Sequence, residues 1–468
     1  MAINLSRNTK VYFTTNVNAA TGVIPDSIAL FTSSNTFEIQ VQDGYSFSQG
    51  TNQTTIQIAE SGATPTRGQR AFNTSLNAVE FSFSTYIRPL ISTNVSAAEK
   101  VLWNALLGSK ELDDAGVAVT GLSRATTTGV GASIATAITT ATYAVGDIIN
   151  FNGVTSAADW NQAGVITAIP GAVSPFTYTV ELTKAPLIGS GATATGTTIK
   201  AYTGQWAKGP GFSYASTMGS NKNQLQKFGM IFVVDSVVYL IDNCALDQAS
   251  VDFGLDAISM VAWTGKGTAL KQAASLTGAA MLGVAQMVTT TANYITNKLS
   301  TMTLESNIGG AQNTTPLSVS YAIPITGGNI TIANNINYLV PTNLGIVNTA
   351  IGYYTGQRSI TGNVTAYLRT GGSTDSGALL NALLTGSATV TEPKFRVQLE
   401  MGGKANAIHL EFDMPGTVLQ IPAVNVADVV ATTINFVAQG YTPDINGASV
   451  PSFDITKTND LTIRYFSA

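Results

Sequence analysis

The sequence contains very little of the chemistry that most enzymes use. Its 468 residues include one cysteine, Cys244, and one histidine, His409. A single cysteine excludes internal disulfides and cysteine-based metal sites, and it fits a chain that folds in a reducing compartment. His409 lies in the alternating run 407–412, which is typical of a strand.

Catalytic and ligand-binding motifs are also missing. The sequence has no Gly-x-Ser-x-Gly elbow, no metal-ligand spacing and no lysine in a P-loop context. Paired acids such as Asp113 and Asp114 are too common on protein surfaces to indicate catalysis. We therefore expect neither an enzyme nor a bound cofactor or metal.

Charge is scarce. Charged residues make up 11% of the chain, with 23 basic and 27 acidic residues and a net charge of −4. Without a basic surplus, tight binding to nucleic-acid phosphates is not expected. Residues 1–7 lack the apolar run of a signal peptide. Residues 273–292 are apolar but interrupted by polar side chains, so we interpret them as a linker rather than a membrane span.

What the sequence has in abundance is short alternating runs separated by Gly, Asn, Ser and Thr. This composition predicts an all-β protein, and the length predicts two or three domains. Strands are expected at Lys10–Asn16, Phe37–Gln42 and Tyr45–Ser48. The Asp43-Gly44 turn predicts that the last two form a hairpin.

A strand followed by a helix occurs twice. The first copy is 78–88 with 103–108, and the second is 359–369 with 380–384. Tyr-x-Arg ends both strands and Asn-Ala-Leu-Leu opens both helical turns, the first behind a capping-box pattern from Ser96 to Glu99. Gly-led strands at 44–48 and 328–332 precede the copies, and 256–263 resembles 428–436 further on. The expected buried residues are Val79, Phe81, Phe83 and Ile87 in the first strand and Ile360, Val364 and Leu368 in the second. We interpret the pattern as a duplication.

Residues 117–202 change to a Thr, Ala and Gly-rich composition that has no counterpart in the second repeat. They predict an inserted small β-barrel on an outer surface, where insertions are tolerated. The predicted fold is all-β with flanking helices: two repeated β-sandwich or half-barrel domains plus this barrel. The boundaries are 1–116 with 203–290 for the first domain, 117–202 for the insertion, 291–443 for the second domain and 444–468 for a C-terminal tail ending in a strand.

Several stretches carry a family resemblance: 60–68, 70–77, 81–87, 239–244, 297–299, 324–328 and 365–368. In this order they resemble the major tail tube protein of tailed bacteriophages, in particular the duplicated, trimer-forming tube subunit of T-five-type siphophages. The sequence departs from that family in two ways. That family has a C-terminal immunoglobulin-like module, which we do not expect here, and the inserted barrel is foreign to it.

The resemblance implies a structural virion protein. In this family six tube domains form a ring whose inner sheets close into one barrel, so three two-domain chains give a pseudo-hexameric ring. Rings stack into the tail tube that conducts DNA into the host. The implied partners are further copies of the chain, the tape-measure protein and genomic DNA in the lumen without tight binding, and the tail-tip and tail-terminator proteins. No membrane insertion is implied, and the protein is assembled in the host cytoplasm.

Other classes stay open: a tube protein of a contractile tail, a surface adhesin or other β-structural protein, and a glycan hydrolase. A hydrolase would need an aromatic-lined cleft, and aromatic residues are only 8% of the chain.

The loop at 60–73 has two interpretations, a solvated hairpin loop or an arm whose arginines pair with carboxylates of a neighbouring subunit. With the two Tyr-x-Arg ends, it supplies the predicted interface residues: Arg67, Arg70, Phe72, Tyr86, Arg88, Tyr367 and Arg369.

The wall of a tube that conducts DNA should not bind it tightly. Each Lys or Arg that neutralises a phosphate adds affinity, and every ring of the tube repeats the contact. Acidic or neutral polar strand faces satisfy this requirement. The predicted lumen residues are Glu38, Gln40, Gln42, Glu80, Ser82, Ser84, Thr361, Asn363 and Thr365. The alternative interpretation is that these faces meet bulk solvent.

Overall fold

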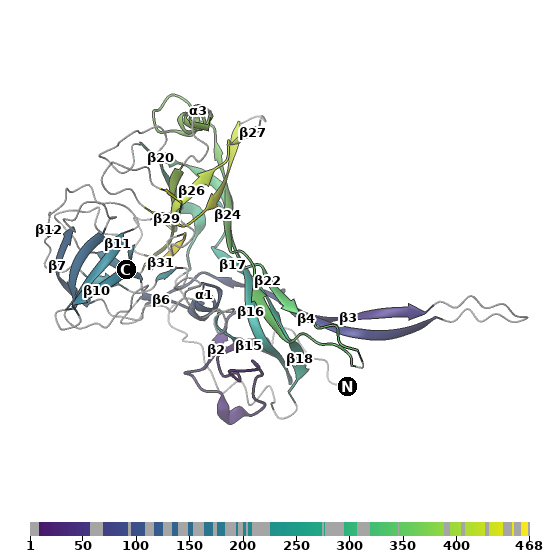
Figure 1. Cartoon of the computed structure of the whole chain (residues 1–468). Helices are drawn as coiled ribbons and strands as arrows, with labels where there is room; N and C mark the ends of the chain where they lie inside the picture. The colour runs from purple at the N-terminus through teal and green to yellow at the C-terminus, as the bar shows by residue number, and fades with distance from the viewer. Residues whose placement is uncertain are drawn as a thin grey trace, which may run out of the picture.

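The computed structural model describes residues 9–56, 69–91, 95–107, 117–124, 133–138, 148–152, 163–171, 176–182, 193–194, 200–202, 205–207, 225–273, 276, 294–306, 319–344, 346–387, 394–403, 408–425, 430–442, 452–453 and 460–466. Most of them lie in strands, and this part of the chain has two α-helices, α1 (Lys100–Leu107) and α3 (Ser376–Ser387) (Figure 1). The all-β prediction is confirmed. The predicted linker lies mostly outside these residues.

One antiparallel path of eight strands crosses the molecule, and we call it the wall. In spatial order it runs through β3 (Ser46–Ile56), β4 (Arg70–Tyr86), β17 (Met260–Gly267), β16 (Val237–Gly254), β21 (Ile325–Ala333), β24 (Ser359–Tyr367), β28 (Ala431–Ala438) and β27 (Ala423–Asn425). Strands from the two halves of the sequence meet where β16 pairs with β21. The wall therefore makes one sheet of both halves.

The two sequence repeats share a strand register. Tyr86 on β4 faces Met260 on β17, and Tyr367 on β24 faces Ala431 on β28. Four residues before each tyrosine, Ser82 faces Ser46 and Asn363 faces Asn329. Ser46 therefore corresponds to Asn329, and Gly328 corresponds to Tyr45. The sequence suggested Gly44 instead, which is one residue away.

One face of the wall is buried. Val79, Phe81, Phe83 and Ile87 are buried as predicted, and so are Ile360 and Val364, whereas Leu368 is only half-buried. Both helices contribute to the same apolar cluster, which runs behind the wall through both halves. At its centre the rings of Trp103 and Trp263 meet edge to face, with centroids 4.7 Å apart. The interpretation of Trp103 as a core residue is confirmed.

The strands behind the first half overturn the predicted hairpin. β2 (Thr36–Ile39) pairs with β1 (Thr9–Thr14), and β1 pairs with β15 (Phe228–Val234), which forms a hairpin with β16. β3 pairs instead with β4. Gly44 has a φ of +98° and lies at a change of direction between the two layers. The predicted turn is therefore present, but the strands on either side of it do not pair with each other. β18 (Ala269–Gln272) pairs with the start of β16.

Behind the second half, β20 (Val319–Ile323), β19 (Thr301–Ser306), β25 (Lys394–Met401) and β26 (His409–Leu419) pair in that order. β31 (Thr462–Phe466) lies between β26 and the short β14 (Gln205–Ala207). The end of the predicted tail is therefore part of the main sheet. The remaining short pairs are β22 (Ile336–Leu339) with β23 (Gly352–Thr355), β5 (Pro89–Ile91) with β6 (Val95–Ala97), and β29 (Tyr441–Thr442) with β30 (Ser452–Phe453).

The inserted segment forms a separate sheet, seen at the left of Figure 1. Its strands are β7 (Val117–Arg124), β8 (Ser133–Ile138), β9 (Ile148–Asn152), β10 (Ala163–Gly171), β11 (Phe176–Leu182), β12 (Thr193–Ala194) and β13 (Lys200–Tyr202). Six of them pair in a closed circle, β7-β13-β9-β10-β11-β8 and back to β7. Closure leaves these six strands without a free edge.

Helix α1 is tied to the C-terminal strand. Glu99 precedes the helix, and its carboxylate accepts a hydrogen bond from the Tyr465 hydroxyl of β31. Both side chains are buried. Burial raises the pKa of Glu99 to about 7, although hydrogen bonds from Tyr465 and from the backbone of Glu99 itself and of Arg88 oppose the rise. The predicted capping box is wrong, because Ser96 lies in β6 and the helix begins only at Lys100; Glu99 instead links α1 to the last strand of the chain.

Candidate functional site

The exposed face of the wall carries mostly polar side chains. Directly opposed residues of antiparallel strands share a face, so the pairings define rows that run across neighbouring strands of the wall. One row runs from Ser84 through Ala262, Ser250 and Thr331 to Thr361. The next runs from Tyr86 through Met260, Asp252, Asn329 and Asn363 to Asn435. We call this surface the polar face.

Hydrogen bonds continue along the polar face where the two halves join. Asn329 of β21 donates through Nδ2 to Ser250 Oγ of β16 at 2.7 Å and also to the carboxylate of Asp252. Thr331 Oγ1 donates to Asn329 Oδ1 at 2.8 Å. Ser250 and Asp252 of β16 are therefore hydrogen-bonded across the junction to Asn329 of β21.

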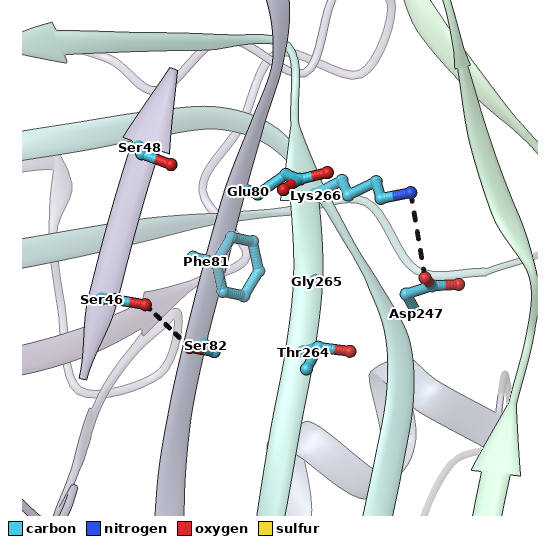
Figure 2. A pocket seen from close by; sticks show the side chains of 9 residues that line it. All are labelled: Ser46, Ser48, Glu80, Phe81, Ser82, Asp247, Thr264, Gly265 and Lys266. Atoms are coloured by element: carbon cyan, nitrogen blue, oxygen red, sulfur yellow. Dashed lines mark hydrogen bonds and ion pairs between the residues drawn. The ribbon is translucent and has the colours of Figure 1, made fainter. Parts of the chain in front are cut away.

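A shallow hollow of about 310 Å³ lies over β3, β4, β17 and β16 (Figure 2). Ser46 and Ser82 line it and share a 2.8 Å hydrogen bond between their hydroxyls. Lys266 is the basic residue of this lining, and its Nζ lies 4.0 Å from Asp247 Oδ2, with Glu80 on the neighbouring strand. Acidic side chains thus outnumber basic ones here, and the one cation faces a carboxylate.

The structure brings six of the nine predicted lumen residues together on the polar face. They are Glu80, Ser82, Ser84, Thr361, Asn363 and Thr365. It does not bring Glu38 there, because Glu38 lies on β2 behind the wall and pairs with Lys10 at 3.1 Å. Gln40 and Gln42 follow β2 toward the wall, and the backbone N–H of Gln42 donates to the carbonyl of Ser84.

Some residues of the polar face were not predicted, among them Ser250, Asp252, Thr264, Lys266, Thr433 and Asn435. The alternation of β17 and β28 in sequence carries the signal for Thr264, Lys266, Thr433 and Asn435. Pairing with β4 and β24 is needed to decide which side they share.

The predicted interface residues fall into two groups. Arg70 and Phe72 lie on the exposed outer part of β4, which projects with β3 as a two-stranded arm at the right of Figure 1. The Arg70 guanidinium carbon lies 5.1 Å above the centre of the Phe72 ring. Arg67 lies outside the described residues. The loop assigned to 60–73 thus ends at Arg70, where β4 begins.

The two Tyr-x-Arg ends differ in exposure. Arg88 is only 7% exposed and its guanidinium carbon lies 5.9 Å from the ring centre of Tyr294 in the same chain, where Tyr86 also packs edge to face. Tyr367 and Arg369 are exposed. Little of Arg88 is therefore left for contact with a neighbour, whereas Tyr367 and Arg369 are accessible.

Among the described residues, no group of three or more His, Cys, Asp or Glu side chains is arranged to hold a metal ion. His409 is buried in β26 and Cys244 is buried in β16. Burial raises the pKa of the Cys244 thiol well above its usual range, so this thiol is a poor nucleophile. Within the same residues, no helix is both long and apolar enough to span a membrane.

No family model matches the chain. Tail tube protein pb6 of Escherichia phage T5 is 27% identical over 451 residues, which cover 94% of this chain and 73% of that protein. The chain is similar to a phage tail tube protein over nearly its whole length. The match confirms the resemblance to T-five-type tail tube proteins.

Proposed function

We propose that this chain is the structural subunit of a phage tail tube, that three copies close into a ring, and that stacked rings form the conduit through which DNA enters the host. The similarity to a tail tube protein over almost the whole chain carries the proposal. The wall supports it, because one chain supplies two in-register halves of a single sheet.

In this proposal the polar face lines the lumen. Its side chains are mostly Ser, Thr and Asn, and its charges are mostly acidic. Such a wall has few cations to exchange for the counterions of DNA, so it does not hold the polymer during transit. The apolar face packs against the helices and outer strands and gives the ring its stiffness. The tape-measure, tail-tip and tail-terminator proteins are the further partners, and the protein is located in the virion tail.

The two halves of the chain are proposed to be copies of one tube domain, with the inserted barrel displayed outside the ring. The shared register at Tyr86 and Tyr367 supports the duplication. Two tube domains per chain require three chains for a sixfold arrangement of domains.

Electron microscopy of the purified full-length protein, combined with mass measurement of the assembled particles, tests the proposal. We expect tubes or rings whose mass is a multiple of three chains. A ring of six full-length chains would contradict the trimer. A protein that stays monomeric at every concentration and salt would contradict the tube.

A further inference from the structure

The wall ends in two free edges. Among the described residues, β3 pairs only with β4 at one end, and β27 pairs only with β28 at the other. A free edge exposes unpaired backbone N–H and C=O groups, which favour pairing with another strand. Neither end is shielded by lysine, since the segments Ser46–Ile56 and Ala423–Asn425 contain none.

The pairing of β16 with β21 within one chain shows how a strand of another chain could pair with a free edge. Where β16 meets β21, Val251 lies opposite Ile330, Ser250 opposite Thr331 and Asp252 opposite Asn329. Val251 and Ile330 are both buried. Asn334, which follows β21, donates through Nδ2 to the carbonyl of Leu106 at 2.8 Å and so covers the C-terminal end of α1.

The free edges correspond to this junction position by position. Asp252 faces Met260 on β17, and Asn425 faces Ala431 on β28, so β27 takes the place beside β28 that β16 takes beside β17. By this register Val424 corresponds to Val251. At the other edge, Ser46 lies opposite Ser82 and Asn329 lies opposite Asn363, so Ser46 and Asn329 are corresponding residues. The residues that follow them, Phe47 and Ile330, therefore also correspond.

Corresponding residues of the two halves differ in solvent exposure, and the more exposed ones mark a surface that no part of the same chain packs against. Val251 is fully buried, whereas Val424 is 42% exposed. At the helix ends, Leu107 of the first Asn-Ala-Leu-Leu turn is 3% exposed, whereas Leu384 of the second is 50% exposed. Ile421, just before β27, is also half exposed. The second half thus leaves Val424 and Leu384 exposed, whereas their counterparts Val251 and Leu107 in the first half are buried.

We propose that β3 of a second copy of the chain pairs antiparallel with β27, with Phe47 opposite Val424, Ser48 opposite Ala423 and Ser46 opposite Asn425. The far end of β3 then lies toward Leu384, as the end of β21 and Asn334 lie against α1. This inference rests on the proposed function and defines its ring contact: each subunit joins the next through the same register that joins its own halves. β3 and β27 lie at opposite ends of one wall, so successive copies extend one sheet.

Disulfide formation between introduced cysteines tests the proposed register of β3 against β27. Directly opposed Cα atoms in antiparallel strands are about 4.5 to 5.5 Å apart, within disulfide reach. The variant Ser48→Cys with Ala423→Cys is assembled, oxidised and separated under non-reducing conditions. We expect linked dimers and trimers of chains. The pair Ser250→Cys with Thr331→Cys is the positive control, because it bridges the internal junction and links no chains.

The pair Ser46→Cys with Ala423→Cys is the register control, since it is two residues out of register at about 7 to 8 Å and should link at least tenfold less. If tubes form and the internal control oxidises while Ser48 and Ala423 do not link chains, the register is overturned and the tube function stands. If no ring or tube forms, the proposed function itself fails.

A second variant tests the apolar contact. Val424→Asp should abolish ring formation and leave the thermal unfolding of the monomer unchanged, because this side chain is exposed in the isolated subunit. Val424→Thr, which keeps the shape, should retain rings. Normal rings from Val424→Asp would also overturn the proposed pairing.

Discussion

Trp103 and Tyr465 are 362 residues apart in sequence, yet the indole Nε1 of Trp103 donates to the Tyr465 hydroxyl at 2.9 Å. The tyrosine donates its own proton to Glu99, so one hydroxyl holds helix α1 of the first half against the last strand of the chain. All three side chains are buried. This contact fixes the second half against the first behind the wall.

Replacing Tyr465 with Phe should destabilise the subunit. The change leaves the Trp103 N–H and the Glu99 carboxylate without this partner, and an unsatisfied buried polar group costs about 1–3 kcal/mol. We expect a lower urea midpoint for the unpolymerised subunit. Tyr354→Phe is the control, because Tyr354 is exposed and should keep the midpoint of the parent protein. Equal midpoints for all three proteins would contradict the role of the hydroxyl.

Glu99 should make stability depend on pH. Its pKa is raised from 4.5 to about 7 by burial, so the folded state holds a proton that the unfolded state loses. The contribution is complete below pH 4.5 and is lost as the pH rises through 7, a change of at most about 3 kcal/mol. Unfolding midpoints of the parent and of Glu99→Gln, measured from pH 4 to 8, should diverge across this window. Parallel curves would show that Glu99 does not titrate there.

The arm formed by β3 and β4 should carry subunit contacts. Arg67→Glu combined with Arg70→Glu should block polymerisation, because reversing a paired charge at an interface costs a few kcal/mol. Circular dichroism should be unchanged, since Arg70 is exposed on the arm. The double glutamine variant is the matched control and should weaken assembly less. Tubes of normal length from the glutamate variant would argue against charged contacts at the arm.

The inserted barrel should be dispensable for assembly. Its six strands close on themselves, so replacing 117–202 with a short Gly/Ser linker removes no strand from the wall. We expect tubes of normal diameter by electron microscopy. Extending the deletion through β14 should lower stability, because Gln205–Ala207 pairs with β31. Insolubility of the shorter deletion would indicate that the barrel supports the subunit.

Cations on the polar face should slow DNA transit. Ser82→Lys with Thr365→Lys places two ammonium groups per chain on that face, and every ring repeats them. We expect assembled tails with impaired DNA ejection that raised salt relieves, because phosphate contacts weaken as salt rises. The uncharged pair Ser82→Asn with Thr365→Asn should eject DNA normally. Unaltered ejection from the lysine variant would place the polar face away from the lumen.

The sequence by itself determined the all-β class, the buried side of β4 and β24, and the residue types of the polar face. These properties depend on period-two alternation within single strands, which is a local pattern and can therefore be recognised in the sequence. The resemblance to tail tube proteins could also be recognised in the sequence, because it lies in short motifs that follow one another in order through both halves.

Only the tertiary structure decided which strands pair. Sequence predicted β2 beside β3, but β2 pairs with β1, because a turn residue fixes a change of direction and not the partner. Pairing also placed Asp252 and Lys266 on the polar face, put Glu38 behind the wall and buried Arg88. The junction of β16 with β21 depends on residues about 80 positions apart. Such contacts leave no local pattern, so they become visible only when the whole sheet is assembled.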